Sequence, residues 1–292
     1  MTRFNYTKTS RKTVTITAAP ASAARIAVPE KIEGFPVDEI SPHAFSGLPE
    51  VLEISLPESI RTVGNYAFYN CRRLRSLFLT DSIEEFGDGA VRLCPSLHHI
   101  EFRINKDHYR PVKDLLADTD AELRVDLVMN DGTARLVFPG FTQEYREDTR
   151  ARAFHQSIHG NGYSYRVCVT RSGVDYEGYD ACFERGGLAV ETAAADIALA
   201  RLMYPRQLSP EAESRYASYL EEHAPDILSD LIRREDEEGV GFLLGKTGIS
   251  KAALDEGIRI ASEKNLTVIT GLLMEALRER FGSGLHAEIF SF

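Results

Sequence analysis

The sequence predicts an α+β protein that combines a short repeat solenoid, a middle segment with a β-hairpin, and a C-terminal set of α-helical hairpin repeats. Three observations predict this class: a 23-residue apolar repeat in the first third, an Asn-Asp-Gly turn near residue 131, and a second, 29-residue periodicity near the end. A chain of 292 residues is long for one compact core, so we expect two or three packed units. The expected domains are residues 1–105, 106–205 and 206–292.

The first periodicity appears when each residue is aligned with the residue 23 positions later. Eight apolar columns then run through three copies: Val37, Ile60, Ile83; Ile40, Val63, Phe86; Ala44, Ala67, Ala90; Phe45, Phe68, Val91; Leu48, Cys71, Cys94; Val51, Leu74, Leu97; Ile54, Leu77, Ile100; and Leu56, Leu79, Phe102. A fixed period in the twenties is typical of a solenoid, in which each unit buries its apolar side against its neighbours. We expect a short strand at Leu74–Leu79 and a tight turn at Gly64 and Gly87.

One stretch of the repeat, LPESIRTVGNYAFYNCRRLRSLFL at residues 56–79, carries a family pattern. It resembles the leucine-rich repeat of the BspA-like family, whose units read approximately I-P-x-S-I-x-x-I-G-x-x-A-F-x-x-C-x-x-L-x-x-I. The resemblance covers about residues 12–105 and implies a capping strand, then a first unit lengthened around residues 34–37. The last copy departs from the pattern at Gly89-Ala90-Val91 and at Pro95, as a terminal unit should. The family resemblance implies a bacterial protein, and because many relatives are exported, it also implies a cell-surface adhesin as one alternative.

The middle segment begins where the 23-residue phase is lost. Residues 104–122, INKDHYRPVKDLLADTDAE, predict a short helix or a linker. Residues 123–138, LRVDLVMNDGTARLVF, alternate apolar and polar side chains around Asn130-Asp131-Gly132, which predicts a β-hairpin. Residues 141–190 are compatible with helix or strand.

The C-terminal part is helical by composition. Ser209-Pro210-Glu211 predicts a capped helix start. At an offset of 29, Leu231 aligns with Ile260, Asp236 with Asn265, Val240 with Ile269, and Leu243-Leu244 with Leu272-Leu273. We therefore expect two stacked helical hairpins, with Ser250 capping a helix and Asn265 in a turn. Residues 258–277 resemble a degenerate ankyrin-type repeat, without its Thr-Pro-Leu-His start.

Composition narrows the classes of partner and compartment. A net charge of -10 argues against a nucleic-acid-binding surface, because such surfaces need clustered Lys and Arg. The sequence has neither an apolar run long enough for a membrane helix nor a signal-peptide core, so we expect a cytoplasmic protein that does not bind membranes. Cys71, Cys94, Cys168 and Cys182 fit a reducing compartment better than a disulfide framework. We expect no cofactor.

Catalytic and metal-binding alternatives centre on residues 141–190. His155 and His159 are four residues apart, which on a helix would place both imidazoles on one face, and Cys168 and Cys182 follow them. These four residues define a metal-dependent or thiol-dependent enzyme or regulator as the alternative function. Their spacing matches no established ligand pattern, and surface histidines with buried thiols explain them as well. The Gly-Lys-Thr at 245–247 lacks the spacing of a phosphate-binding loop.

The strands of the solenoid offer the stronger functional surface. Alternate side chains of a strand point away from the core, so one exposed sheet face is predicted. Its expected partner-binding residues are Glu53, Ser55, Ser76, Phe78, Thr80, His99, Glu101 and Arg103. Phe78 is the expected contact anchor, unless it packs against the entry segment or the next domain. We therefore predict a non-catalytic protein-binding scaffold, to which the helical tail contributes as a possible second surface.

Overall fold

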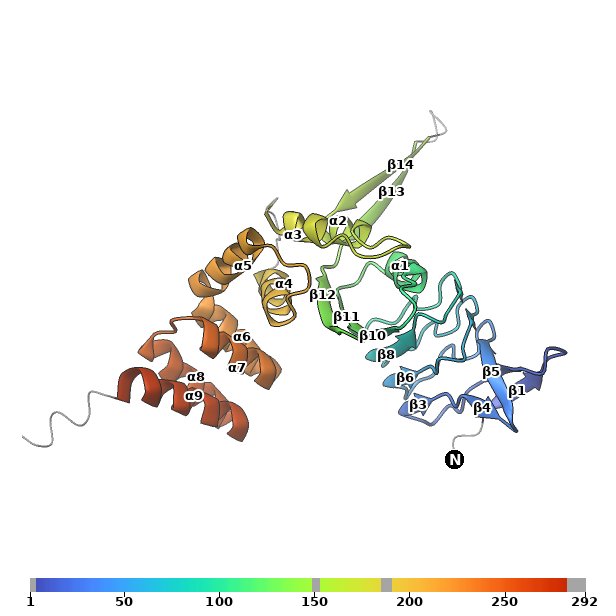
Figure 1. The fold of residues 1–292 in the computed structure, drawn as a ribbon, viewed down its shortest axis with the longest axis horizontal. Helices are drawn as coiled ribbons and strands as arrows, with labels where there is room; N and C mark the ends of the chain where they lie inside the picture. Colours follow the sequence, from blue (N-terminus) through green and yellow to red (C-terminus); the bar gives the residue numbers. More distant parts are fainter. Residues whose placement is uncertain (1–3, 149–152, 185–190, 283–292) are drawn as a thin grey trace, which may run out of the picture. The chain divides into compact units, whose positions relative to one another are not determined.

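The computed structural model describes residues 4–148, 153–184 and 191–282 of the chain (Figure 1). Contacts within the chain divide it into two compact units, Met1–Ala189 and Val190–Phe292. The first unit joins the repeats to most of the middle segment, and the second contains the helical tail. The three domains expected at 1–105, 106–205 and 206–292 stay a prediction.

The chain enters the repeats through a sheet with one short strand from each unit. β1 (Asn5–Lys8) pairs antiparallel with β2 (Val14–Ala18), which runs parallel to β5 (Phe35–Ile40). The sheet continues in the order β1-β2-β5-β7-β9, with β7 at Thr62–Val63 and β9 at Glu85–Phe86, and β4 (Lys31–Ile32) pairs with β5. β2 is the capping strand that the resemblance implies, because its Val14 and Ile16 are fully buried ahead of the first unit.

A second sheet forms the other side of the solenoid, in the order β12-β11-β10-β8-β6-β3. Its repeat strands are β3 (Arg25–Ala27), β6 (Glu53–Ser55), β8 (Ser76–Thr80) and β10 (His99–Ile104). These strands run parallel to one another in register steps of 23 between β6, β8 and β10. Residues paired in neighbouring strands are therefore 23 positions apart, which equals the sequence period. Each repeat unit thus adds one strand to the sheet.

The core of the solenoid lies between the two sheets and consists of the eight apolar columns. Every column is buried in all three copies, with one exception. Phe86, in the terminal strand β9, is half-buried, because no further repeat follows to cover it. The repeat predicted from the sequence is therefore confirmed, and the exception marks its end.

Gly64 and Gly87 lie in tight turns, as predicted, but the reason differs from the expected backbone freedom. A Cβ atom at Gly64 would lie 2.4 Å from Pro42 N, and one at Gly87 would lie 2.4 Å from Asn65 N. Neither glycine has a positive φ. Both positions exclude a side chain because successive turns pack directly on one another.

The middle segment continues the second sheet instead of leaving it. After α1 (Arg110–Ala117), β11 (Leu123–Met129) adds parallel to β10, and β12 (Gly132–Phe138) returns antiparallel to β11. Gly132, at φ +138°, begins β12 directly after the turn at Asn130-Asp131, which confirms the predicted hairpin. The hairpin thus ends the sheet of the solenoid.

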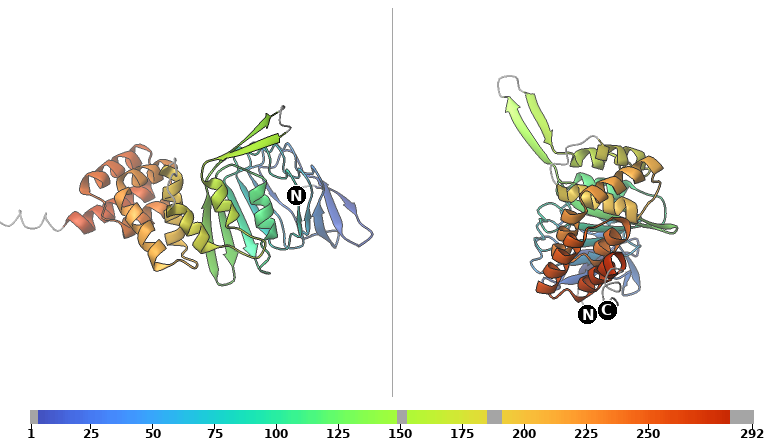
Figure 2. Two further views of the ribbon diagram at one scale, coloured as in Figure 1. Left: turned by 90° about the horizontal axis from the view of Figure 1, so that it is seen from above. Right: turned by 90° about the vertical axis from the view of Figure 1, so that its left-hand side faces the viewer.

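Residues 141–184 form two further pairs of elements. β13 (Thr142–Asp148) and β14 (Ala153–His159) pair with each other and project from the first unit (Figure 2). α2 (Gly162–Val167) and α3 (Tyr176–Glu184) follow. Cys168, expected within a strand-like run, is instead the C-cap residue of α2.

The second unit is helical. Its elements are α4 (Glu191–Met203), α5 (Pro210–Glu222), α6 (Ala224–Arg234), α7 (Glu237–Lys246), α8 (Lys251–Glu263) and α9 (Thr267–Phe281). The predicted caps are confirmed, since Ser209 accepts a hydrogen bond from Ala212 N at 3.2 Å and Ser250 accepts one from Ala253 N at 3.3 Å. No helix in the described parts of the chain is both long and apolar enough to cross a membrane.

The 29-residue periodicity corresponds to two helical hairpins, α6–α7 and α8–α9. Equivalent helices of the two hairpins, α6 with α8 and α7 with α9, lie side by side. Val240 and Ile269, aligned in the sequence, are both buried, and Asn265 adopts φ +60° in the turn between α8 and α9. The stacked hairpins are confirmed, whereas the ankyrin label is not.

Candidate binding surface

The outward side of β6, β8, β10 and β11 presents three rows of side chains, which we call the sheet face. The rows are Glu53, Ser76, His99 and Arg124; Ser55, Phe78, Glu101 and Asp126; and Thr80, Arg103 and Val128. Residues between these positions, such as Ile54, Leu77 and Ile100, are fully buried in the core. The alternation predicted from the sequence therefore orients the strands as expected.

Phe78 lies in the middle row and contacts a neighbour on the same face. Its ring meets His99 edge to face, with ring centroids 5.9 Å apart and planes at 84°. Phe78 is half-buried, so part of the ring still faces outward. The aromatic pair thus provides an apolar contact area that is already ordered.

Asp126 holds the other edge of His99. Its Oδ2 lies 3.3 Å from His99 Nε2, while Arg135 of β12 donates from Nε to Oδ1 at 2.8 Å and from Nη2 to Oδ2 at 3.1 Å. Burial alone would raise the pKa of Asp126, but the hydrogen bonds with His99 and Arg135 outweigh burial and lower it to about 2. Asp126 is therefore ionised at neutral pH, and it fixes the orientation of His99 beneath Phe78.

Asp126 and Arg135 were not among the predicted site residues, although a signal for them exists. They are directly opposite each other in the hairpin. A turn at Asn130-Asp131-Gly132 sets this pairing. The signal missing from the sequence was that β11 would join the repeat sheet beside His99.

One predicted residue of the face is not exposed. Thr80 is only 5% exposed, and its Oγ1 accepts a hydrogen bond from Ser82 N at 3.3 Å. Its hydroxyl supports the turn after β8, because a buried hydroxyl requires a partner. Arg103, in register with Thr80, is exposed, and the other predicted residues of the face are intermediate.

The residues of the metal-dependent or thiol-dependent alternative do not assemble as the helical spacing implied. His155 and His159 lie in β14, where four residues span about 13 Å. The side chain of His155 lies outside the described residues. Cys168 and Cys182 are buried. Within the described ranges, no three His, Cys, Asp or Glu side chains are grouped as metal ligands.

The cysteines of the repeat columns behave as small buried side chains. Cys71 and Cys94 are free, and their Sγ atoms lie 3.0 Å from Phe45 O and 3.1 Å from Phe68 O. Burial raises the pKa of Cys71, and it raises that of Cys94 to about 12. Neither thiol is a thiolate at neutral pH, so neither is activated as a nucleophile.

The turns that precede β6, β8 and β10 are joined by a second set of backbone hydrogen bonds, the turn ladder, formed by residues 43–47, 66–70 and 89–93. His43, Phe45 and Gly47 donate to Asn65, Ala67 and Tyr69, at 3.1, 2.8 and 2.8 Å. Tyr66, Phe68 and Asn70 donate in the same way to Asp88, Ala90 and Arg92. In the last copy the equivalent donors are Gly89, Val91 and Leu93, for which no further repeat supplies acceptors.

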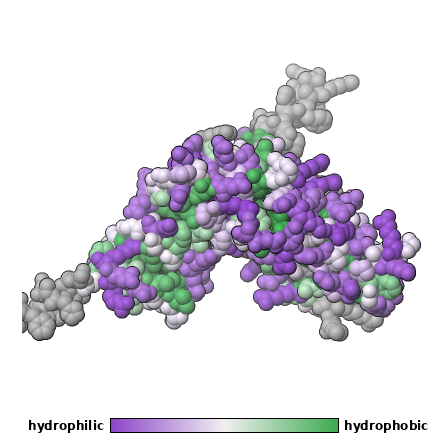
Figure 3. All heavy atoms as spheres, viewed as in Figure 1, coloured by the Kyte–Doolittle hydropathy of each residue, from purple (hydrophilic) through white to green (hydrophobic). Residues whose placement is uncertain are grey.

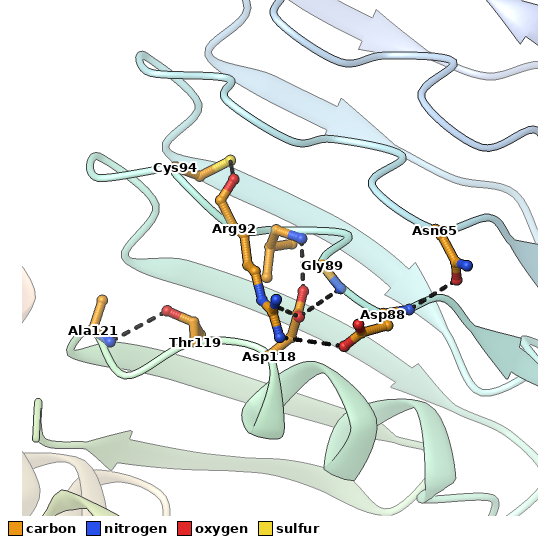
Figure 4. A network of polar contacts seen from close by, with 9 residues as sticks. Asn65, Asp88, Gly89, Arg92, Cys94, Asp118, Thr119 and Ala121 are labelled. Carbon is orange, nitrogen blue, oxygen red and sulfur yellow. Dashed lines mark hydrogen bonds and ion pairs between the residues drawn. The ribbon is translucent and has the colours of Figure 1, made fainter. Parts of the chain in front are cut away.

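Asp118, the C-cap residue of α1, takes over at the end of the turn ladder (Figure 4). Its Oδ1 accepts from Gly89 N and its Oδ2 from Val91 N, each at 2.8 Å, and Arg92 Nε lies 3.5 Å away. The side chain is 4% exposed. Burial raises the pKa of Asp118, and the two backbone hydrogen bonds offset this in part. Nothing in the sequence distinguished Asp118 from its acidic neighbours.

An open groove of about 1130 Å³ lies beside this capped end. The repeat turns contribute Tyr69, Arg72 and Leu93, and the segment after α1 contributes Asp120, with Phe141 beyond it. The sequence analysis did not predict this groove, because it is built by segments far apart in the chain.

Comparison with known proteins places the repeat region in a family. Residues 27–110 match the family model of the BspA type leucine rich repeat region, with six copies. No curated protein matches the chain. The match to the family model falls on the strands and turns described above.

Solved structures with some similarity come from three organisms. A leucine rich cell surface protein of Faecalibacterium prausnitzii A2-165 is 19% identical with a TM-score of 0.31, over 45% of this chain and 43% of that one. A Leucine Rich Repeat protein of T. pallidum is 18% identical with a TM-score of 0.25, over 44% and 80%. A leucine-rich repeat protein of Bacteroides ovatus ATCC 8483 is 16% identical with a TM-score of 0.22, over 36% and 48%. The chain thus spans less than half of the Faecalibacterium protein. On the strength of the family model and of the repeat geometry, residues 27–110 are a leucine-rich repeat region of the BspA type.

Proposed function

We propose that this protein is a non-catalytic scaffold that binds a protein partner through its sheet face. The observation that carries the proposal is the ordered group Phe78, His99, Asp126 and Arg135. Phe78 supplies an aromatic contact, and the ion pair behind His99 keeps the contact in place. Aromatic and arginine side chains dominate the energetics of interfaces, and anchors that are ordered in advance lose less entropy on binding.

The remainder of the sheet face suits the rim of such an interface. Ser55, Ser76 and Glu101 surround Phe78 with partly exposed polar groups, and Arg103 is exposed. Charged rim residues steer a partner and select it more than they add affinity. The overall charge of -10 favours a partner with a basic surface, since opposite net charges accelerate encounter.

The helical unit supports a second, separate surface. Hydrophobic residues gather on the visible side of α6–α9 (Figure 3). On α9, Val268 and Met274 are each 53% exposed. Contiguous exposed apolar patches are common at sites of protein contact. The cytoplasm is the proposed compartment, because the cysteines are few and buried, which fits a reducing environment better than a disulfide framework.

The test is a quantitative affinity capture from host lysate with the full chain. The variant Phe78→Asp with Arg103→Glu alters the sheet face, and the variant Ile158→Asp with Lys113→Glu makes the same charge changes at exposed positions elsewhere in the first unit. We expect the first variant to lose a specific partner that both the wild type and the second variant retain. Retention of all partners by the first variant would exclude the sheet face as the site.

A further inference from the structure

The turn ladder ends with one backbone donor that Asp118 does not reach. Gly47 N and Asn70 N, the equivalents of Leu93 N, donate to the next copy at 2.8 and 3.0 Å. Within the described residues, Leu93 N makes no hydrogen bond. The carboxylate of Asp118 already uses one oxygen for Gly89 and the other for Val91. The ladder therefore presents one free donor in the position where a further chain would supply a carbonyl.

The backbone conformation of Leu93 is unusual for a leucine. Its φ is +59°, as is that of Asn70, and Gly47 has φ +69°. Glycine and asparagine adopt this left-handed region readily, whereas leucine does so at a cost. Leu93 is also 60% exposed, so burial of its side chain within the described chain offsets little of that cost. The repeat turn sets this conformation in each copy, and in the last copy a leucine has to adopt it.

The groove beside Leu93 has aromatic walls that are held rigidly. Tyr69 meets Tyr66 edge to face at 5.6 Å, and Tyr66 stacks on His43 at 5.2 Å. On the wall that Phe141 contributes, the guanidinium of Arg166 lies over the Phe141 ring, 4.8 Å from its centroid. The walls are thus formed before any ligand arrives.

Arg166 is fixed in turn by backbone carbonyls. It is 7% exposed and donates to Pro139 O at 2.6 Å, to Gly162 O at 3.1 Å and to Ala121 O. These three acceptors lie in different segments, so Arg166 ties the loop after α1 to the segment that carries Phe141. The position of Phe141 in the groove is therefore not that of a loose surface side chain.

The groove carries one charge of each sign that lacks an ion pair. Arg72, on the repeat turns, donates to Asn70 Oδ1 at 3.0 Å and makes no ion pair within the described part of the chain. Asp120, on the loop after α1, is exposed, and no described cation lies within ion-pair distance of its carboxylate, although Arg166 attracts it from further away. A ligand with an acid near Arg72 and a base near Asp120 would complement both.

We propose that this groove binds an extended peptide segment of a partner protein. A backbone carbonyl of the peptide accepts the hydrogen bond of Leu93 N, as a further repeat would, and an apolar side chain contacts Leu93 between Tyr69 and Phe141. An acidic residue on one side of that apolar residue faces Arg72, and a basic residue on the other side faces Asp120. Addition of an extended chain to a free backbone edge is an established mode of peptide recognition. The proposal does not depend on the sheet face.

The test begins with a display library of linear random peptides selected on the full chain. Enriched peptides are synthesised with a fluorescent label, and their dissociation constants are measured by anisotropy. Leu93→Gly, which keeps the backbone donor and removes the strained side chain, should weaken binding about tenfold or more. It should also raise the midpoint of thermal unfolding, which separates lost contact from lost folding. Undiminished binding by Leu93→Gly, or no enrichment at all, would overturn the proposal.

Charge reversal tests the orientation of the peptide. Arg72→Glu should weaken binding about threefold, and a peptide with its acid replaced by Lys should restore it. Asp120→Lys should also weaken binding, and a peptide with its basic residue replaced by Glu should restore it. Arg11→Glu, at an exposed turn between β1 and β2, is the matched control and should bind as the wild type does. Phe78→Asp should also leave peptide binding unchanged, whereas failure of both reversed peptides to restore binding would contradict the assignment of charges.

Discussion

The second sheet and the turn ladder of the solenoid end in different ways at the same terminus. On the sheet side, β11 and β12 continue the backbone pairing as real strands. On the turn side, one carboxylate, that of Asp118, accepts two of three backbone donors and leaves Leu93 N free. A strand closes a ladder along its whole length, whereas a side chain closes only as many positions as it has oxygens. The difference explains why the groove lies at the turn side.

The strongest test of this comparison is Asp118→Ala. The substitution removes both acceptors, so two backbone groups near the core lose their hydrogen bonds. We expect a loss of about 3 kcal/mol in the free energy of unfolding, measured by urea denaturation. Asp114→Ala, one turn earlier on α1 at an exposed ion pair with Arg110, should cost less than about 0.5 kcal/mol. Equal costs for the two variants would show that Asp118 is not the cap of the ladder.

On the sheet side, the corresponding test is Arg135→Met. It leaves Asp126, with a side chain only 9% exposed, without its main cation. We expect a loss of about 2 kcal/mol in the free energy of unfolding, because an uncompensated buried charge is costly. Arg25→Met, which breaks the exposed pair of Arg25 with Glu53 in the same sheet, is the control and should cost under about 0.5 kcal/mol. A cost for Arg135→Met no greater than the control would mean that the pair does not hold the face.

The two carboxylates should also respond to acid in opposite ways. The pKa of Asp126 is lowered to about 2, from an ordinary value of about 3.9, so its stabilising contribution is present above pH 4 and is lost as the pH falls towards 2. The destabilisation caused by Asp126→Asn should therefore shrink in that window. Burial raises the pKa of Asp118, so the wild type gains stability on protonation and the cost of Asp118→Asn should grow as the pH falls towards 4. Both effects can be measured from the unfolding free energies of the wild type and the two variants across pH 2–7. If the costs of Asp126→Asn and Asp118→Asn changed with pH in the same direction, the predicted difference between the two carboxylates would be wrong.

The smallest expected effect on stability is that of Leu93→Gly. Relief of the left-handed strain should outweigh the extra freedom of glycine in the unfolded chain, for a net gain of about 0.5 kcal/mol. Differential scanning calorimetry would detect it as a raised unfolding midpoint. Leu93→Asn, which introduces the residue type that Asn70 provides in the preceding copy, should also stabilise. Destabilisation by both variants would show that the side chain of Leu93 supports the fold itself.

Local pattern was enough to predict several elements. The eight columns predicted the core of the repeats, since each unit repeats the same contacts at the same spacing. The Asn130-Asp131-Gly132 turn predicted β11 and β12, and Ser209 and Ser250 predicted two helix starts. Each of these features is governed by residues within a few positions or by strict periodicity, so the sequence contains the necessary information.

Other features depended on how distant segments meet. Thr80 was expected on the exposed face, yet the turn after β8 encloses it. His155 and His159 were considered on a helix, yet they lie in a strand whose partner is β13. Asp118 is one of several acids around α1, and only the position of the last repeat turn makes it the cap. Such roles follow from tertiary neighbours, which periodicity does not specify.

By itself, the sequence determined a leucine-rich solenoid, a hairpin and a helical tail, because apolar periodicity and turn residues dictate which backbone hydrogen bonds form locally. Only the tertiary structure decided that the hairpin joins the repeat sheet, that Asp126 and Arg135 stand beside His99, and that the turn ladder stops one donor short at Leu93. The physical reason is that a buried polar group takes its partner from whichever segment packs against it. That packing is settled by the whole fold.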